Sequence, residues 1–222
     1  MDVLTEQKRT ELVWVRTPVQ ARSQATLSRL LDATETLLDK EPFDDLSVQA
    51  ICKEAKSSVG AFYTRFPDKL ALLHLLHDRL TEEARATANL ALDPVRWEGI
   101  ALGEIVKTMA TFMVTEYTRR GGLRRELVRR NGVDGEFRRR TVEIATLTVD
   151  RLANVLDLRR LEHAHSDTRV AADFSYRILF SVLDQAAQLG EHGPAGIVLP
   201  QDTMVTELTR AICAYLSVKL PG

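Results

Sequence analysis

The 222-residue sequence has little cysteine and no long apolar run, and each absence excludes a class of protein. Its two cysteines, Cys52 and Cys213, are too few for a disulfide framework or a structural zinc site, so we read both as buried thiols in a reducing compartment. No stretch approaches the roughly 20 apolar residues that a bilayer-spanning helix needs, and we expect no membrane partner. Residues 1–9 lack an apolar core of signal-peptide length, which favours a cytoplasmic location.

The sequence also lacks the basic excess of proteins that coat nucleic acid, because its formal net charge is -1. Any DNA contact must therefore be local. Residues 16–31 carry Arg16, Arg22 and Arg29 and no acid. Residues 46–69 carry Lys53, Lys56, Arg65 and Lys69 against Glu54 and Asp68. These two patches are where phosphates would dock.

Strand patterns and enzyme motifs are missing as well. Apolar and polar residues do not alternate over several positions, and there is no internal repeat. There is no phosphate-cradling glycine loop, nucleophile elbow or Cys-His signature. Two histidine groups, at residues 74–78 and 163–167, are weak metal candidates, since His74 and His77 would need a third ligand from elsewhere. We expect an all-α protein with no catalytic residue, metal or cofactor.

Apolar residues at helical spacing predict four helices in the first 92 residues. The first covers about residues 20–40, and Ser47 is the expected N-cap of a second helix about two turns long. A third short helix covers residues 58–65, with Phe62 and Phe66 on its buried edge. Helices this short are marginal in water and must pack into a compact motif.

The rest of the chain is predicted to be helical too. After the fourth helix, which begins at Pro67, a break at residues 92–94 marks a domain boundary. Five further helices are expected at about residues 97–118, 123–130, 136–158, 168–189 and 202–218.

The order of short helices in the first part of the chain is that of a helix-turn-helix. The helix at residues 58–65, with small and polar residues on its outer face, would enter the DNA major groove. The helix that starts at Ser47 would cross above the phosphates. On the pattern alone, a helical corner that serves only as core stays open.

Residues 47–55 and 58–69 closely resemble the DNA-binding domain of TetR-family repressors, including the spacing of Gly60, Tyr63, Phe66 and Lys69. The resemblance covers roughly residues 16 to 75, and beyond it only length and helical content are similar. The chain is therefore expected to divide into an N-terminal extension (1–15), a three-helix helix-turn-helix domain (16–66), a linking helix (67–92) and a helical ligand-binding and dimerisation domain (93–222).

The resemblance implies roles for residues of the motif. Ser47 and Tyr63 match residues that bond phosphates, and Lys69 matches a lysine whose cation at a helix start calls for a nearby phosphate. Arg22 would follow the backbone or enter the minor groove. Base reading is expected from Ser58, Val59, Gly60, Ala61, Thr64 and Arg65, although helical spacing also gives Val59 a packing role.

Two residues of the turn depart from the family pattern. Lys56 stands where the family usually has glycine, and Ser57 where a small apolar residue is usual. Because positive φ is uncommon for residues other than glycine, we expect Lys56 to adopt another turn geometry and to aim its ammonium at a phosphate.

The helical domain should supply a two-fold interface and a ligand cavity. Two recognition helices must stand about 34–36 Å apart, and candidates for the dimer interface are Phe180, Leu183, Ala187, Leu208, Ile212, Tyr215 and Leu216. Candidates for a ligand cavity are Met109, Phe112, Met113, Phe137, Phe174 and Ile178. Internal core is the alternative for both sets. The arginine-rich stretch 119–140 suggests either an anionic ligand or solvated helix faces.

The sequence thus predicts a homodimeric transcriptional regulator, a repressor that a small-molecule effector releases from a palindromic double-stranded DNA operator. The alternative is a helical ligand-binding or scaffolding protein without specific DNA binding.

Overall fold

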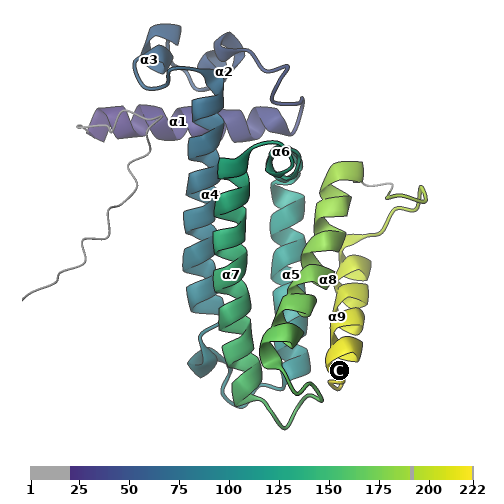
Figure 1. Cartoon of the computed structure of the whole chain (residues 1–222). Helices are drawn as coiled ribbons and strands as arrows, with labels where there is room; N and C mark the ends of the chain where they lie inside the picture. The colour runs from purple at the N-terminus through teal and green to yellow at the C-terminus, as the bar shows by residue number, and fades with distance from the viewer. Residues whose placement is uncertain (1–20, 191–192, 222) are drawn as a thin grey trace, which may run out of the picture. The chain divides into compact units, whose positions relative to one another are not determined.

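A computed structural model describes residues 21–190 and 193–221, with side chains from Gln24 onward, and within these ranges the chain is helical without strands (Figure 1). This confirms the all-α prediction. The helices are α1 (Ala21–Leu38), α2 (Val48–Glu54), α3 (Val59–Tyr63), α4 (Lys69–Ala91), the 3₁₀ helix η1 (Pro94–Trp97), α5 (Leu102–Arg119), α6 (Gly121–Asn131), α7 (Gly135–Leu158), α8 (Thr168–Leu189) and α9 (Gln201–Leu216). None of the helices in the described ranges is long and apolar enough to cross a membrane. The predicted extension at residues 1–15 lies outside the described residues.

The 3₁₀ helix η1 is an element that the sequence patterns did not predict. Asp93 is its N-cap and accepts a hydrogen bond from the Val95 N–H at 3.1 Å, and Pro94 occupies its first turn. Trp97 at its end is buried and donates from Nε1 to the Ala91 carbonyl at 2.7 Å. Residues 94–97 therefore form a separate helical turn before α5, although Trp97 was predicted to begin the helix at residues 97–118.

The chain forms two compact units that divide inside α4, between Arg79 and Leu80. We call them the head unit and the body unit. The head unit buries the apolar stripes of α1 to α3 and of the first half of α4; its fully buried large side chains include Leu30, Leu46, Ile51, Phe62, Phe66 and Leu72. Arg79 on α4 forms ion pairs with Asp32 at 2.6 Å and Glu35 at 2.9 Å, which ties α4 to α1.

The body unit is built from long helices around one core. Its main pairs are α5 with α9 and α7 with α8, and Figure 1 shows α5, α7, α8 and α9 running alongside one another. Gly103 on α5 is required by a close approach, because a Cβ there would lie 2.3 Å from the Lys219 carbonyl oxygen. The segment that follows α9 therefore packs directly on the backbone of α5.

Candidate nucleic-acid interface

Two serines begin the two short helices of the head unit. The Ser47 hydroxyl accepts from the Ala50 N–H at 3.0 Å at the start of α2, and the Ser58 hydroxyl accepts from the Ala61 N–H at 3.0 Å at the start of α3. The predicted N-cap at Ser47 is thus present, and Ser58 is a second cap. Each cap satisfies an N–H that the helix itself leaves without a partner.

The turn between α2 and α3 is a left-handed helix cap with lysine at the position that glycine usually takes. Lys56 has φ +49°. Its N–H donates to the Lys53 carbonyl at 3.2 Å, and the Ser57 N–H donates to the Cys52 carbonyl at 2.9 Å, which is the hydrogen-bond pattern of a Schellman motif. The expectation that Lys56 adopts another turn geometry is therefore wrong. The two hydrogen bonds hold the turn in a conformation that costs a side-chain-bearing residue about 1–2 kcal/mol.

Arg29 braces this turn from α1. Its Nε donates to the carbonyl of Ala55, the last residue before the turn, at 3.2 Å. The carbonyls at a helix end lack intrahelical partners, and a cation suits the negative end of the helix dipole. The sequence analysis identified Arg29 only as one basic residue of a patch. Its contact with Ala55 could not be predicted, because the partner is a backbone carbonyl 26 positions away and no sequence motif indicates it.

The helix α3 presents the predicted DNA-reading residues on its exposed side. Phe62 on α3 and Phe66 after it are completely buried, whereas Val59 is 36% and Tyr63 54% exposed. Gly60 is exposed as well. The apolar edge thus faces the core of the head unit, and Val59 and Tyr63 beside it are left exposed. The exposure of Val59 leaves its side chain available for a base contact.

Three other candidates on or next to α3 make local contacts. The Thr64 hydroxyl donates to the Gly60 carbonyl at 2.8 Å, and the Arg65 guanidinium donates to the Ala61 carbonyl at 2.7 Å. Ala61 and Arg65 are half-buried. These side chains close the end of the short helix, so any base contact by Thr64 or Arg65 would have to be made beside this capping role.

Gly60 has no packing reason to lack a side chain. A Cβ added there would meet one atom within 4 Å, the Ser58 Oγ at 3.9 Å, which is ordinary van der Waals contact. Glycine inside a helix is less favourable than alanine by about 1 kcal/mol. The small surface at Gly60 is therefore unexplained by the head unit alone and suits the close approach of another molecule.

Lys69 uses its ammonium group inside the head unit. Its Nζ donates to the carbonyls of Phe43 at 2.6 Å, Asp44 at 3.0 Å and Leu46 at 2.7 Å, and lies 4.7 Å from the centre of the Phe43 ring. An ammonium has three donors, and all three are occupied. The resemblance implied a DNA phosphate as the partner of this cation at the start of α4. In the structure the partners are carbonyl groups of the α1–α2 connection, which Lys69 fixes in place.

The remaining motif candidates are placed as follows. Lys56 is exposed and Ser57 half-buried. The side chain of Arg22 lies outside the described residues. The exposed part of the candidate interface consists of Ser47, Lys56, Ser58, Val59, Gly60, Tyr63 and Thr64.

The predicted dimer residues include several that their own chain buries. Leu183, Leu208, Ile212 and Leu216 are between 2% and 6% exposed and belong to the core of the body unit. Their apolar spacing therefore reflects packing within one chain, which the sequence analysis gave as the alternative to a dimer interface. Phe180, Ala187 and Tyr215 are half-buried against the same core. On α8 the exposed large apolar residues are instead Val170, Phe174, Val182 and Leu189.

The predicted ligand-lining residues do not share one environment. Phe137 is completely buried, Met109, Met113 and Ile178 pack against the body core, and Phe112 and Phe174 are 40% and 49% exposed. The arginine-rich stretch is largely paired internally: Arg129 and Arg130 both bind the buried Glu126, and Arg139 and Arg140 both bind Glu136. The ligand-lining set remains a prediction.

The histidine groups do not form metal clusters. Among the residues that the structure describes, no three His, Cys, Asp or Glu side chains are arranged to hold a metal ion. His163 and His165 contact the carbonyls of Leu156 at 3.0 Å and Tyr215 at 2.7 Å. Both rings therefore fasten the α7–α8 connection to neighbouring helices.

Comparisons with known proteins agree with this geometry. Residues 30–76 match the family model of bacterial regulatory proteins of the tetR family. No curated protein matches the sequence. Solved structures share the fold: a TetR-family regulator described as putative from Mesorhizobium loti MAFF303099 is 15% identical with a TM-score of 0.71, over 89% of this chain and 98% of that one. Salmonella enterica GusR is 19% identical with a TM-score of 0.62, over 86% and 95% of the two chains.

A TetR transcription regulator from Haloarcula marismortui is 14% identical with a TM-score of 0.67, over 87% of this chain and 97% of that one. The family match covers α2, the left-handed turn, α3 and the Lys69 clamp, and the fold match extends over the body unit. On these grounds residues 30–76 belong to the tetR family of bacterial regulatory proteins, and the chain as a whole shares the fold of solved TetR-family regulators.

Proposed function

We propose that this protein is a cytoplasmic homodimeric repressor that binds a palindromic operator through α3 and leaves it when a small molecule binds the body unit. The observation that carries the proposal is the outer face of α3, where Gly60 is open and Val59 and Tyr63 are exposed on a helix fixed at both ends. The major groove admits one α-helix. A short helix with a small outer face can approach base edges closely.

Within this proposal the contacts divide by type. Val59, Gly60 and Ala61 face the bases, and the exposed Tyr63 and Lys56 reach phosphates on either side. Ser47 marks the helix start that approaches the backbone, where N–H groups suit a phosphate. Lys69 does not need to touch DNA, because its three carbonyl contacts position α2 relative to α4.

The homodimer would form through the exposed side of α8 and α9. The ring of Phe174 on α8 packs against that of Tyr215 on α9 in a tilted arrangement, with the ring centres 4.9 Å apart, and Phe174 is 49% exposed. Val170 and Val182 add apolar surface on α8, while Ala211 and Ala214 give α9 an exposed small face. Small and apolar residues together allow close helix packing across a two-fold axis.

The test is a fluorescence anisotropy titration of the purified protein with duplex DNA from upstream of its own gene, at two salt concentrations and with nonspecific competitor. We expect saturable, competitor-resistant binding by two protomers per site, with affinity that falls steeply as salt rises. Binding that competitor removes on this DNA and on flanking promoters would contradict the proposal and favour the scaffold alternative. An effector that releases the protein must bind more weakly in the presence of operator by the same factor.

A further inference from the structure

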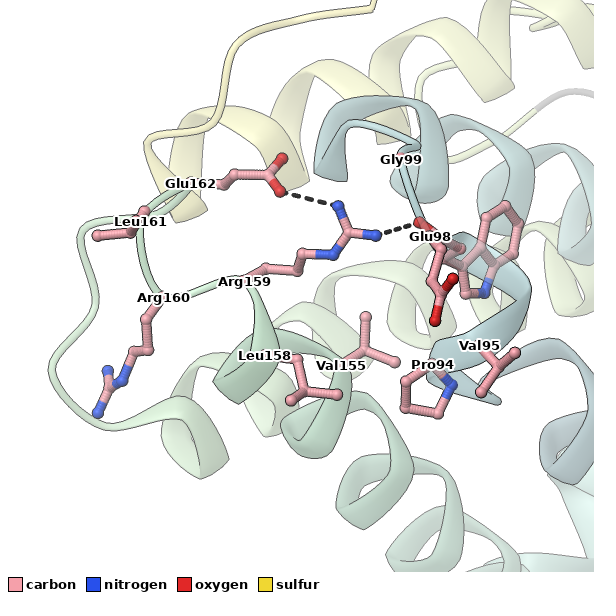
Figure 2. A pocket seen from close by; sticks show the side chains of 11 residues that line it. Pro94, Val95, Glu98, Gly99, Val155, Leu158, Arg159, Arg160, Leu161 and Glu162 are labelled. Atoms are coloured by element: carbon pink, nitrogen blue, oxygen red, sulfur yellow. Dashed lines mark hydrogen bonds and ion pairs between the residues drawn. The ribbon is translucent and has the colours of Figure 1, made fainter.

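The body unit contains a pocket that lies apart from every predicted ligand residue. It has a volume of about 650 Å³ and opens between η1 and the turn after it on one side and the C-terminal end of α7 on the other (Figure 2). Small-molecule sites occupy about 300–1,000 Å³. The pocket therefore has the size of a binding site for a small organic molecule.

The walls of this pocket are apolar and unusually exposed. Pro94 and Val95 come from η1, and Val155 and Leu158 come from α7. Val95 is 70% and Leu158 69% exposed, and Leu161 at the rim is fully exposed. Large apolar side chains that gather at one opening on a protein surface mark a site of interaction.

The two arginines of the pocket are occupied by other contacts. Arg159 forms an ion pair with Glu162 at 2.9 Å and donates to the carbonyls of Ile100 and Trp97. Arg160 donates to the carbonyls of His165 at 2.7 Å and Ser166 at 2.9 Å, and Figure 2 shows its guanidinium turned away from the pocket. Neither guanidinium is directed at a ligand in the pocket.

The two acidic residues of the pocket differ from each other. Glu162 pairs with Arg159 and also accepts from the Leu102 N–H at 2.7 Å; burial alone would raise its pKa, but these two donors lower it. The side chain of Glu98 takes part in no ion pair or hydrogen bond among the described residues. Figure 2 shows its carboxylate directed into the space beside Pro94 and Val155.

We infer that this pocket binds a small hydrophobic organic cation, with Glu98 as its counter-ion. The apolar walls cover the body of such a ligand, and the unpaired carboxylate of Glu98, which is exposed at the opening, favours a positive over a negative charge. All the residues that line the site belong to the body unit, so its ligand can be tested without DNA.

Calorimetric titration with two probes of equal shape and opposite charge tests the inference. Tetraphenylphosphonium is the cation and tetraphenylborate the anion. We expect the cation to bind the full-length protein at least about tenfold more tightly than the anion, a difference of about 1.4 kcal/mol. Equal affinities, a preference for the anion, or no saturable binding of the cation would each overturn the inference.

Three variants place the binding in this pocket. Glu98→Gln should remove most of the preference for the cation, and Leu158→Arg should weaken the cation at least about tenfold by adding a positive charge to the exposed wall. Glu104→Gln, on α5 and outside the pocket, is the matched control and should bind as the parent protein does. Unchanged cation binding in both Glu98→Gln and Leu158→Arg would show that the probe binds elsewhere and overturn the inference.

Discussion

The head unit and the body unit are both helical, but different interactions fix their helices. In the head unit α2 and α3 have seven and five residues, and polar atoms at particular positions hold their ends: two serine caps, the left-handed turn at Lys56 and the Lys69 clamp. In the body unit α5, α7 and α8 have 18 to 24 residues and share one apolar core.

This difference explains where family resemblance is found. A helix of one or two turns is marginal without caps and tertiary contacts, so its residue types are constrained position by position. A long helix needs only apolar residues at helical spacing, which many sequences satisfy. The family model accordingly matches residues 30–76, whereas the body unit is similar to solved structures in fold.

The largest effect is expected from breaking the clamp of the head unit. Lys69→Met removes three charge-assisted hydrogen bonds to the α1–α2 connection, and we expect it to lower the free energy of unfolding by about 3 kcal/mol. Urea denaturation measures this, with Lys53→Met on the exposed side of α2 as the control. If Lys69→Met left stability unchanged and weakened only DNA binding, Lys69 would be a phosphate ligand and not a clamp.

The clamp also shows what sequence patterns can and cannot predict. The bounds of α7 and α8 were close to the expected 136–158 and 168–189, because apolar periodicity is a local property. The partners of Lys69 and Arg29 are backbone carbonyls 23 to 26 positions away, and carbonyls carry no residue-type signal. Periodicity likewise identified the apolar stripe of α9 but not that the same chain covers Leu208 and Ile212.

The body unit should be most sensitive where backbone approaches backbone. Gly103→Ala places a methyl group 2.3 Å from the Lys219 carbonyl oxygen, and we expect a loss of about 2 kcal/mol as the C-terminal segment shifts. Gly121→Ala at the start of α6 is the control, because a Cβ there meets nothing within 4 Å. Thermal unfolding compares the two, and equal stabilities would show that the contact is not tight in solution.

A smaller gain is expected at the turn of the head unit. Lys56→Gly relieves the left-handed conformation at φ +49° and should raise the free energy of unfolding by up to about 1 kcal/mol. Lys53→Gly, inside α2, should lower it by about 1 kcal/mol. Denaturant melts of both variants check the opposite signs; a loss of stability in Lys56→Gly would mean that the turn is not strained.

The smallest effect concerns Asp184, a half-buried carboxylate in the body unit. Burial raises the pKa of Asp184 above its ordinary 3.8, although the Tyr117 hydroxyl donates to it at 2.8 Å. The folded protein therefore holds this proton more tightly than the unfolded chain, and the resulting stabilisation is lost as pH rises through the folded pKa.

The Asp184→Asn variant isolates this effect, because its amide oxygen can still accept from Tyr117. Its stability relative to the parent protein should increase from about pH 3 to about pH 7. Urea melts across this range measure the difference, with the exposed Asp45→Asn as the control. A difference that is constant with pH would contradict the raised pKa.

The most direct test of the central claim is a paired measurement on Gly60→Ala. If the outer face of α3 meets DNA, the added methyl group should stabilise the head unit by about 0.5–1 kcal/mol and weaken operator binding at least about tenfold. Urea denaturation and anisotropy on the same preparation give the two values. Unchanged operator affinity in a folded Gly60→Ala protein would show that α3 does not approach the DNA at Gly60 and would contradict the account.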